Sequence, residues 1–239
     1  MNGSLQRLGR GVLAVRTLVG ALACRGRRSD RDAPPAASPS SPAAARLVFG
    51  LTDVRLAIVD QPLDARLALP AGALAAFNGG FFDAEGEAEG YAVSRGRVLA
   101  AYDPALGGGV LVVRGPRAEL YDGETFAPPA DPPDFALQAR PRLVVDGAVN
   151  IQSETGRRAA RTALCLRDDG RSLEVVVRPA PPDAGPTLLE LARELAAAGC
   201  EDALNLDGGP STGVVTPTRT SQPRGPIRHV VVVRPRDAR

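Results

Sequence analysis

The residues best suited to carry out chemistry lie in the segment Asn-Leu-Asp-Gly-Gly-Pro-Ser-Thr at 205–212. An expected helix and a short strand precede this segment. Asp207 is therefore expected at the C-terminal end of a strand, where its carboxylate could act as a nucleophile or a general base. The N–H groups and hydroxyls that follow could hold an anion, and they belong to Gly208, Gly209, Ser211 and Thr212. The structural alternative is that Asp207 only caps a turn.

Amide and cationic side chains occur in three further segments. Asn78 opens the run Asn-Gly-Gly-Phe-Phe-Asp at 78–83, which taken alone is an ordinary signal for a hairpin turn. Arg142 and Arg161 each begin an apolar strand. An arginine fixed at that position could bind phosphate, although an isolated one is more often a surface ion pair or a solvated side chain.

Residues 209–213 also match the Gly-x-Ser-x-Gly pattern of serine hydrolases. That pattern requires a helix after the serine, but residues 214–226 are rich in Pro, Thr and Arg and have no helical period. No Asp or Glu lies between Ser211 and His229, the only histidine, so the usual order of acid and then histidine is absent. The sequence therefore argues against serine hydrolysis.

The elements that must position these residues are mostly strands. Short β-branched runs predict strands at 54–59, 98–102, 110–113, 143–145, 163–166, 173–177 and 230–233. One helix is well marked, because Thr187 and Glu190 fit a capping box and Gly199 is placed to end it. A shorter helix is expected over 70–76. We therefore predict one α+β domain over residues 46–239, with mixed or antiparallel sheets and few helices.

Taken together and in this order, the four segments resemble the phosphodiester glycosidase family. The resemblance spans roughly residues 50–235 and rests on Asn-Gly-Gly-Phe-Phe at 78–82, Gly90 with Gly96, Pro-Arg-Leu-Val-Val-Asp-Gly at 141–147, Arg-Thr-Ala at 161–163, and 205–212. It implies that family's fold and hydrolysis of the glycosidic C–O bond of a sugar-1-phosphodiester. An N-acetylhexosamine-like sugar on a phosphorylated glycan or polymer is the implied substrate. The sequence departs from the family in a short region before Asn78 and an acidic loop at 85–89.

The implied chemistry suits the residues present. A phosphate monoester, with a second pKa near 6, leaves more readily than a sugar alkoxide. The site then needs cations or N–H donors for phosphate, a carboxylate for the anomeric carbon or water, and polar groups for the sugar. We expect Asp207, Asn78 and Arg161 to be catalytic. The expected substrate-binding residues are Gly79, Gly80, Arg142, Asn205, Gly208, Gly209, Ser211 and Thr212.

Within this set the expected roles differ. Asp207 is expected to be the nucleophile or base, Arg142 and Arg161 to clamp phosphate, and the 208–212 donors to form a nest on the phosphate side. Asn78 and Asn205 are expected to orient the sugar. Asp83 and Glu85 are the reserve candidates for a second carboxylate. No cofactor is expected, and the sequence leaves open whether a divalent cation joins Asp207.

Composition excludes several other classes of protein. The chain has 239 residues, no lysine and one histidine, which removes a P-loop lysine, a Schiff-base lysine and a metal site built on several histidines. Seven of the 29 Arg but only two of the 27 acidic residues lie in residues 1–32. The remaining chain holds 22 Arg and 25 acidic residues, so it has no basic excess to suggest a nucleic-acid partner.

The N-terminal segment and the cysteines bear on location. Residues 1–24 fit a signal or lipoprotein leader that ends at Cys24, and the alternative is a basic, unstructured tail. Residues 25–45 are expected to be a disordered linker rich in Ala, Pro and Ser. We expect an exported or lipid-anchored protein of the bacterial cell envelope. Cys165 and Cys200 could pair there, or could be two buried thiols.

A binding protein is the competing function. The same fold could hold an anionic glycan outside the cell without cleaving it. Such a module needs Asn78 and the arginines but not the carboxylate of Asp207, so Asp207 is the residue on which the two functions differ. The sequence does not indicate an oligomeric state.

Overall fold

The computed structural model describes residues 44–153 and 155–236. The predicted leader at 1–24 and nearly all of the predicted linker at 25–45 lie outside these residues. The first described strand, β1 (Ala45–Gly50), begins at the predicted start of the folded domain.

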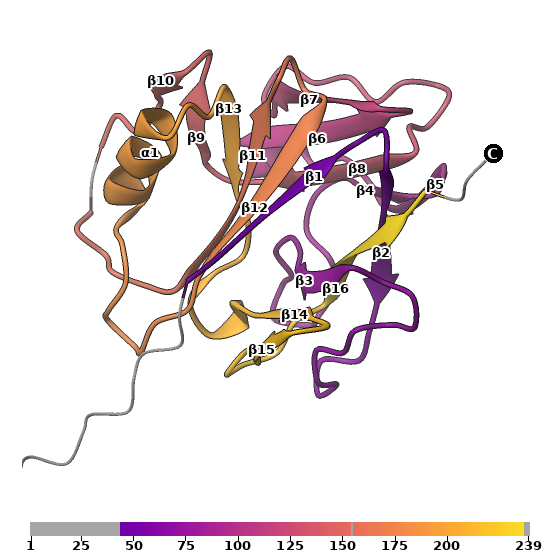
Figure 1. The fold of residues 1–239 in the computed structure, drawn as a ribbon. Helices are drawn as coiled ribbons and strands as arrows, with labels where there is room; N and C mark the ends of the chain where they lie inside the picture. The colour runs from indigo at the N-terminus through magenta and orange to yellow at the C-terminus, as the bar shows by residue number, and fades with distance from the viewer. Residues whose placement is uncertain (1–43, 154, 237–239) are drawn as a thin grey trace, which may run out of the picture. The chain divides into compact units, whose positions relative to one another are not determined.

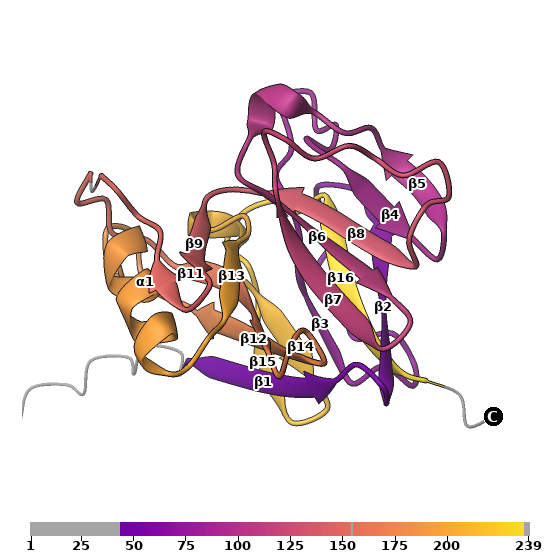
Figure 2. The same cartoon turned by 90° about the horizontal axis from the view of Figure 1, so that it is seen from above.

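The described chain folds into three antiparallel sheets (Figures 1 and 2). The first has the order β1, β12 (Ser172–Arg178), β11 (Arg161–Arg167), β13 (Asp202–Asn205), β9 (Arg142–Val145) and β10 (Ala148–Val149). The second has the order β15 (Arg219–Ser221), β14 (Val214–Thr216), β3 (Ala75–Asn78), β16 (His229–Pro235) and β2 (Val54–Asp60). The third has the order β5 (Arg97–Ala100), β4 (Ala92–Ser94), β8 (Phe135–Ala139), β6 (Gly109–Arg114) and β7 (Arg117–Asp122).

The one α-helix among the described residues is α1 (Leu188–Ala197). Its capping box is confirmed: Thr187 Oγ1 accepts from Glu190 N at 3.2 Å, and Glu190 Oε2 accepts from Thr187 N at 3.1 Å. Gly199 follows the helix with a φ of 79°, a conformation that glycine adopts without strain. Two short 3₁₀ turns, Pro104–Leu106 and Gly209–Ser211, are the other helical segments of residues 44–153 and 155–236. No helix in the described ranges has the length and apolarity to cross a membrane.

The fold is richer in strand than the predicted α+β class, and the helix predicted over 70–76 is wrong. Residues 70–73 form a turn in which Gly72 has a φ of 71°, and Ala75 and Ala76 belong to β3. Both alanines are fully buried between neighbouring strands. Packing in the sheet therefore overrides the helix propensity of alanine.

The core is shared by all three sheets, and strand alternation divides it. Leu164 and Leu166 of β11 face a central cluster that includes Phe77 of β3 and Leu137 of β8. Ala163 and Cys165, the alternate residues of β11, face a second cluster with the apolar side of α1. The first sheet thus has one face toward the other sheets and one toward the helix.

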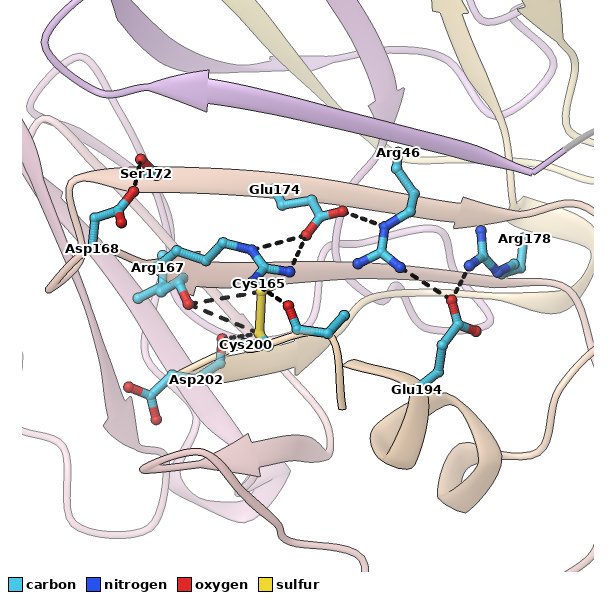
Figure 3. Close-up of polar contacts among 12 residues, drawn as sticks. Arg46, Cys165, Arg167, Asp168, Ser172, Glu174, Arg178, Glu194, Cys200 and Asp202 are labelled. Carbon is cyan, nitrogen blue, oxygen red and sulfur yellow. Dashed lines mark hydrogen bonds and ion pairs between the residues drawn. A yellow bond between two sulfur atoms is a disulfide. The ribbon is translucent and has the colours of Figure 1, made fainter. Parts of the chain in front are cut away.

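The helix face of this sheet is crosslinked in two ways (Figure 3). A disulfide joins Cys165 of β11 to Cys200, just after α1, which settles the pairing that the sequence leaves open. Beside it, the buried carboxylate of Glu174 binds Arg46 of β1 and Arg167 of β11, and the Arg167 Nη2 to Glu174 Oε2 distance is 2.7 Å. Burial alone would raise the pKa of Glu174, but the hydrogen bonds and charges of the two arginines outweigh burial and lower it.

We predict that Glu174→Gln lowers the free energy of unfolding by about 3 kcal/mol near pH 7, because it leaves two arginines without their buried counter-charge. The lowered pKa stabilises the fold above the carboxyl's unfolded pKa, and this contribution is lost as pH falls through the folded pKa. The difference from wild type should therefore shrink in acid. Urea unfolding at several pH values measures it.

Glu124→Gln is the matched control, because Glu124 is exposed and its side chain has no ion-pair partner among the residues that the structure describes. It should change stability by less than about 0.5 kcal/mol. Equal effects of the two substitutions would contradict a stabilising role for the Glu174 cluster.

Candidate active site

Asp207 lies just after β13, half-buried at the end of the first sheet. Its Oδ1 accepts from Gly208 N at 2.7 Å, and its own N–H donates to Gly79 O at 3.2 Å. Burial raises the pKa of Asp207, and the charge of Glu89 adds to this, while hydrogen bonds from Ser211 and Gly208 oppose it. A carboxylate held in this way is poised to accept a proton or to attack a cationic carbon.

Asn78, the last residue of β3 in the second sheet, fixes the backbone of Asp207. Its Nδ2 donates to Asp207 O at 2.7 Å, and its Oδ1 accepts from Thr162 Oγ1 at 2.7 Å and from Gly213 N at 3.1 Å. The side chain is fully buried. Asn78 therefore joins β3, β11 and the 207–213 loop. In this structure it has the geometry of a positioning residue rather than of a group that touches the sugar.

Gly79 and Gly80 let this segment approach its neighbours closely. Gly79 N donates to His229 O at 2.8 Å, and a Cβ at position 79 would lie 2.9 Å from His229 Cβ. A Cβ at position 80 would lie 3.3 Å from Leu137 Cδ1. The two glycines thus serve backbone packing between β16 and β8, which in turn holds Asn78 in place.

The donors predicted to form an anion nest already have acceptors in this structure. Gly208 N is bound to the Asp207 carboxylate, and Gly209 N donates to Ala160 O at 2.7 Å. The N–H groups of Ser211 and Thr212 donate back to Gly208 and Gly209 at 3.2 and 3.3 Å. A phosphate could use these N–H groups only if they left these bonds.

The hydroxyls of this segment differ. Ser211 Oγ has two possible acceptors, Pro226 O at 2.9 Å and the carboxylate of Asp207, and its one proton can bond to only one of them at a time. Thr212 Oγ1 is buried and has no hydrogen-bond partner within the described ranges. Thr212 is therefore the member of the predicted nest that still has a polar side-chain atom to offer.

Arg161 lies beside this loop. It is at the start of β11, on the same face as Ala163 and hence on the helix side of the sheet, and a Cβ on Gly208 would lie 3.9 Å from Arg161 Cδ. Its guanidinium is held by backbone carbonyls, with Nη2 2.9 Å from Arg157 O and Nε 3.3 Å from Pro186 O. The backbone therefore holds this half-buried cation in place, with its side-chain stem near Gly208, the residue after Asp207.

Arg142 and Asn205 are placed differently from each other. Arg142 forms an ion pair with Asp122 of β7, so its charge is already matched on that side of the sheet. Asn205 Nδ2 donates to Arg140 O at 2.8 Å, while Asn205 Oδ1 is buried and has no partner in the described part of the chain. Asn205 thus retains one acceptor near the site. The clamping role predicted for Arg142 requires it to exchange its carboxylate partner.

Sequence reasoning missed two residues of this region, Arg140 and Glu89. Arg140 is exposed, and its guanidinium carbon lies 5.9 Å from the centre of the Phe81 ring. Glu89 N donates to Phe81 O at 3.0 Å, and Asp207 N donates to Gly79 O. The backbone of the 79–81 segment therefore binds both acidic residues. The sequence signal that could have placed Glu89 near the site is the hairpin pattern of residues 81–89.

The reserve carboxylates have other surroundings. Asp83 Oδ1 accepts from Glu87 N at 2.8 Å and closes the turn of the 81–89 hairpin, and Glu85 is exposed at its tip. Within the described residues no three His, Cys, Asp or Glu side chains converge as a metal-binding group. His229 is buried behind Gly79, with Nε2 3.0 Å from Asp60 Oδ1.

Comparisons with known proteins agree with this architecture. The sequence model of the phosphodiester glycosidase family matches residues 71–234, a range that contains all four motif segments. The catalytic domain of zebrafish N-acetylglucosamine-1-phosphodiester alpha-N-acetylglucosaminidase, auto-inhibited by its pro-peptide, is similar in fold. Its TM-score is 0.60 at 18% identity, over 83% of this chain and 86% of that one.

A protein from Burkholderia pseudomallei K96243 has a similar fold too, with a TM-score of 0.57 at 16% identity over 80% of this chain and 74% of the other. No curated protein matches the sequence. The resemblance that the sequence motifs indicate is therefore confirmed at the level of the family and its fold.

We predict that Asp207→Asn does not lower the melting temperature at neutral pH. A carboxyl whose folded pKa is raised makes a stabilising contribution that is complete below its unfolded pKa, near 3.9, and that is lost as pH rises through the folded pKa. Replacing it with a neutral amide should therefore leave stability equal or higher at pH 7, with the gain vanishing in acid. Melting curves between pH 3 and pH 8 test this. A loss of several degrees at pH 7 would instead support the turn-capping role.

We predict that Gly79→Ala destabilises the protein by about 1–3 kcal/mol, because the new methyl group meets His229 and its backbone. Gly50→Ala is the control, since its nearest neighbour would be the movable carboxylate of Asp53 at 3.0 Å. Denaturant unfolding compares the two. Wild-type stability in Gly79→Ala would show that the segment can move away from β16.

Proposed function

The chain belongs to the phosphodiester glycosidase family, and from this premise we propose that it hydrolyses the glycosidic C–O bond of a sugar-1-phosphodiester. An N-acetylhexosamine-like sugar, carried on a phosphorylated glycan or polymer, is the substrate that we propose. The products are the free sugar and a phosphate monoester. The observation that carries the proposal is the half-buried carboxylate of Asp207, whose backbone is fixed by Asn78 and whose next residue, Gly208, lies near the Arg161 side chain.

The residues around Asp207 match the demands of this reaction. Water must add to the anomeric carbon, the bond from that carbon to the phosphate oxygen must break, and the electron pair leaves with the phosphate. Asp207 either removes the proton from water or attacks first and forms a glycosyl ester that water then cleaves. We assign to Arg161 the role of stabilising the charge that grows on the departing phosphate, because its side chain lies near the Gly208 backbone.

Two residues extend this assignment. Glu89, whose charge raises the pKa of Asp207, is our candidate for the second carboxylate, in place of the reserve residues Asp83 and Glu85. Arg140, next to Phe81, is an exposed cation on the same side as the 78–82 segment. The phosphate monoester is a good leaving group, so weak assistance from an acid is sufficient.

We further propose that the protein works outside the cytoplasm, in the bacterial cell envelope. The disulfide between Cys165 and Cys200 supports this location, because such bonds persist mainly in oxidising compartments. Export by the 1–24 leader and lipidation at Cys24 are part of the proposal, and both lie outside the described residues.

A module that binds anionic glycans without cleaving them is the second candidate. The exposed arginines near the site, Arg140, Arg157 and Arg224, favour it, because binding needs cations but no nucleophile. The carboxylate of Asp207 decides between the two functions, since only the enzyme needs it.

The test incubates the full chain with hexose- and N-acetylhexosamine-1-phosphodiesters, in both anomeric forms, in ¹⁸O-labelled water. We expect label in the released sugar, and we expect Asp207→Asn to lower kcat about a thousandfold or more. Asp131→Asn, an exposed acid between β7 and β8, is the matched control and should retain activity.

Label in the phosphate would show attack at phosphorus and overturn the glycosidase mechanism. Absence of turnover across the panel, together with binding of the same compounds, would favour the binding module.

A further inference from the structure

Two adjoining hollows border the loop that follows Asp207. The first has a volume of about 280 Å³ and lies between Gly209 with Pro210, the 157–160 segment and the 181–183 turn. The second, of about 200 Å³, shares Gly209 and Arg224 with the first and is also lined by Thr212. Three of the residues that line them, Gly209, Pro210 and Thr212, come shortly after the proposed catalytic carboxylate in the chain.

The charge of the first hollow is strongly positive. Three arginines line it, Arg157, Arg158 and Arg224, against one carboxylate, Asp183. Arg158 is matched, because its Nη1 lies 2.9 Å from Glu190 Oε2. The side chains of Arg157 and Arg224 are exposed, and neither makes a hydrogen bond or an ion pair with any residue that the structure describes.

The second hollow has a donor without an acceptor. Thr212 is 4% exposed, and its hydroxyl oxygen has no hydrogen-bond partner in the part of the chain that the structure describes. Buried hydroxyls in folded proteins are nearly always paired, because leaving one unpaired costs free energy. Two unmatched cations and an unpaired hydroxyl around two hollows with shared lining residues offer donors that an oxyanion with several oxygens would satisfy.

The position of the hollows relative to the proposed reaction indicates what such an anion belongs to. Gly209 follows Asp207 by two residues, which span at most about 7 Å of chain. Arg161, the proposed partner of the scissile phosphate, donates to the carbonyl of Arg157. One segment therefore carries a cation for the first phosphate and, four residues earlier, a cation directed to the hollow.

We infer that the two hollows form a subsite for a second phosphate on the leaving-group side of the substrate, with Arg157, Arg224 and Thr212 as its ligands. The inference rests on the proposed function. It narrows the substrate class to sugar-1-phosphodiesters whose aglycone carries another phosphate a short linker away, as in a polymer of repeating phosphodiesters. The arginines select the leaving group, and the sugar is recognised elsewhere.

The kinetic test compares two substrates of the full chain that differ only in the aglycone: N-acetylglucosamine-1-phosphate methyl ester, and the same sugar phosphate joined to glycerol 3-phosphate. Wild type should have a higher kcat/KM for the second. The double variant Arg157→Ala, Arg224→Ala should reduce the ratio of the two kcat/KM values about tenfold or more, through KM, because charged hydrogen bonds are lost. High salt should reduce the ratio as well.

Arg97→Ala is the matched control. Arg97 is an exposed arginine of β5 in the third sheet, so its loss removes one of the two charges that the double variant loses but should leave the ratio unchanged. An equal ratio in wild type and the double variant would overturn the subsite while leaving the glycosidase intact.

A binding measurement separates failure of the subsite from failure of the enzyme. Pyrophosphate is titrated into the proteins and its binding is followed by ³¹P NMR. It should bind wild type and Arg97→Ala with equal affinity, and it should bind the double variant about tenfold more weakly. If neither sugar substrate turns over, the proposed function fails and this titration alone decides the subsite. Equal binding by all three proteins, or no binding by wild type, would overturn it.

Discussion

The site depends on one buried amide. The side chain of Asn78 bonds to the carbonyl of Asp207, the hydroxyl of Thr162 and the N–H of Gly213, and so ties together three segments far apart in the sequence. In a low-dielectric interior each of these bonds is strong, and an unmade one leaves a buried polar group unpaired. The close approach of Gly79 to β16 sets the amide in place, and Asp207 takes its position from it. The position of the Asp207 carboxylate is thus determined by contacts of the surrounding backbone.

Local patterns in the sequence were sufficient to predict most of the strands and the helix. The β-branched runs of β6, β12 and β16 and the Thr187–Glu190 capping box are short-range signals, and each was confirmed. The helix expected over 70–76 failed because alanine favours a helix only when nothing else decides, and Ala75 and Ala76 are enclosed by neighbouring strands. The Cys165–Cys200 bond depends on a contact between β11 and the end of α1, which no local pattern specifies.

The roles of single side chains were harder to predict than the motifs that contain them. Arg142 and Arg140 are two residues apart, yet the first faces the carboxylate of Asp122 and the second lies near Phe81. The glycines of the 208–209 pair were expected to offer N–H groups, but these groups are consumed by Asp207 and Ala160. Glu89 became visible only through the hairpin that places it near Asp207. In each case a partner remote in the sequence determines the role.

Gly79 has no room for a side-chain carbon, and this limits where the protein can be altered. Substitution there costs stability, whereas the side chains of the arginines at 140, 157 and 224 are exposed. A directed-evolution library for new leaving groups therefore belongs at those three surface positions.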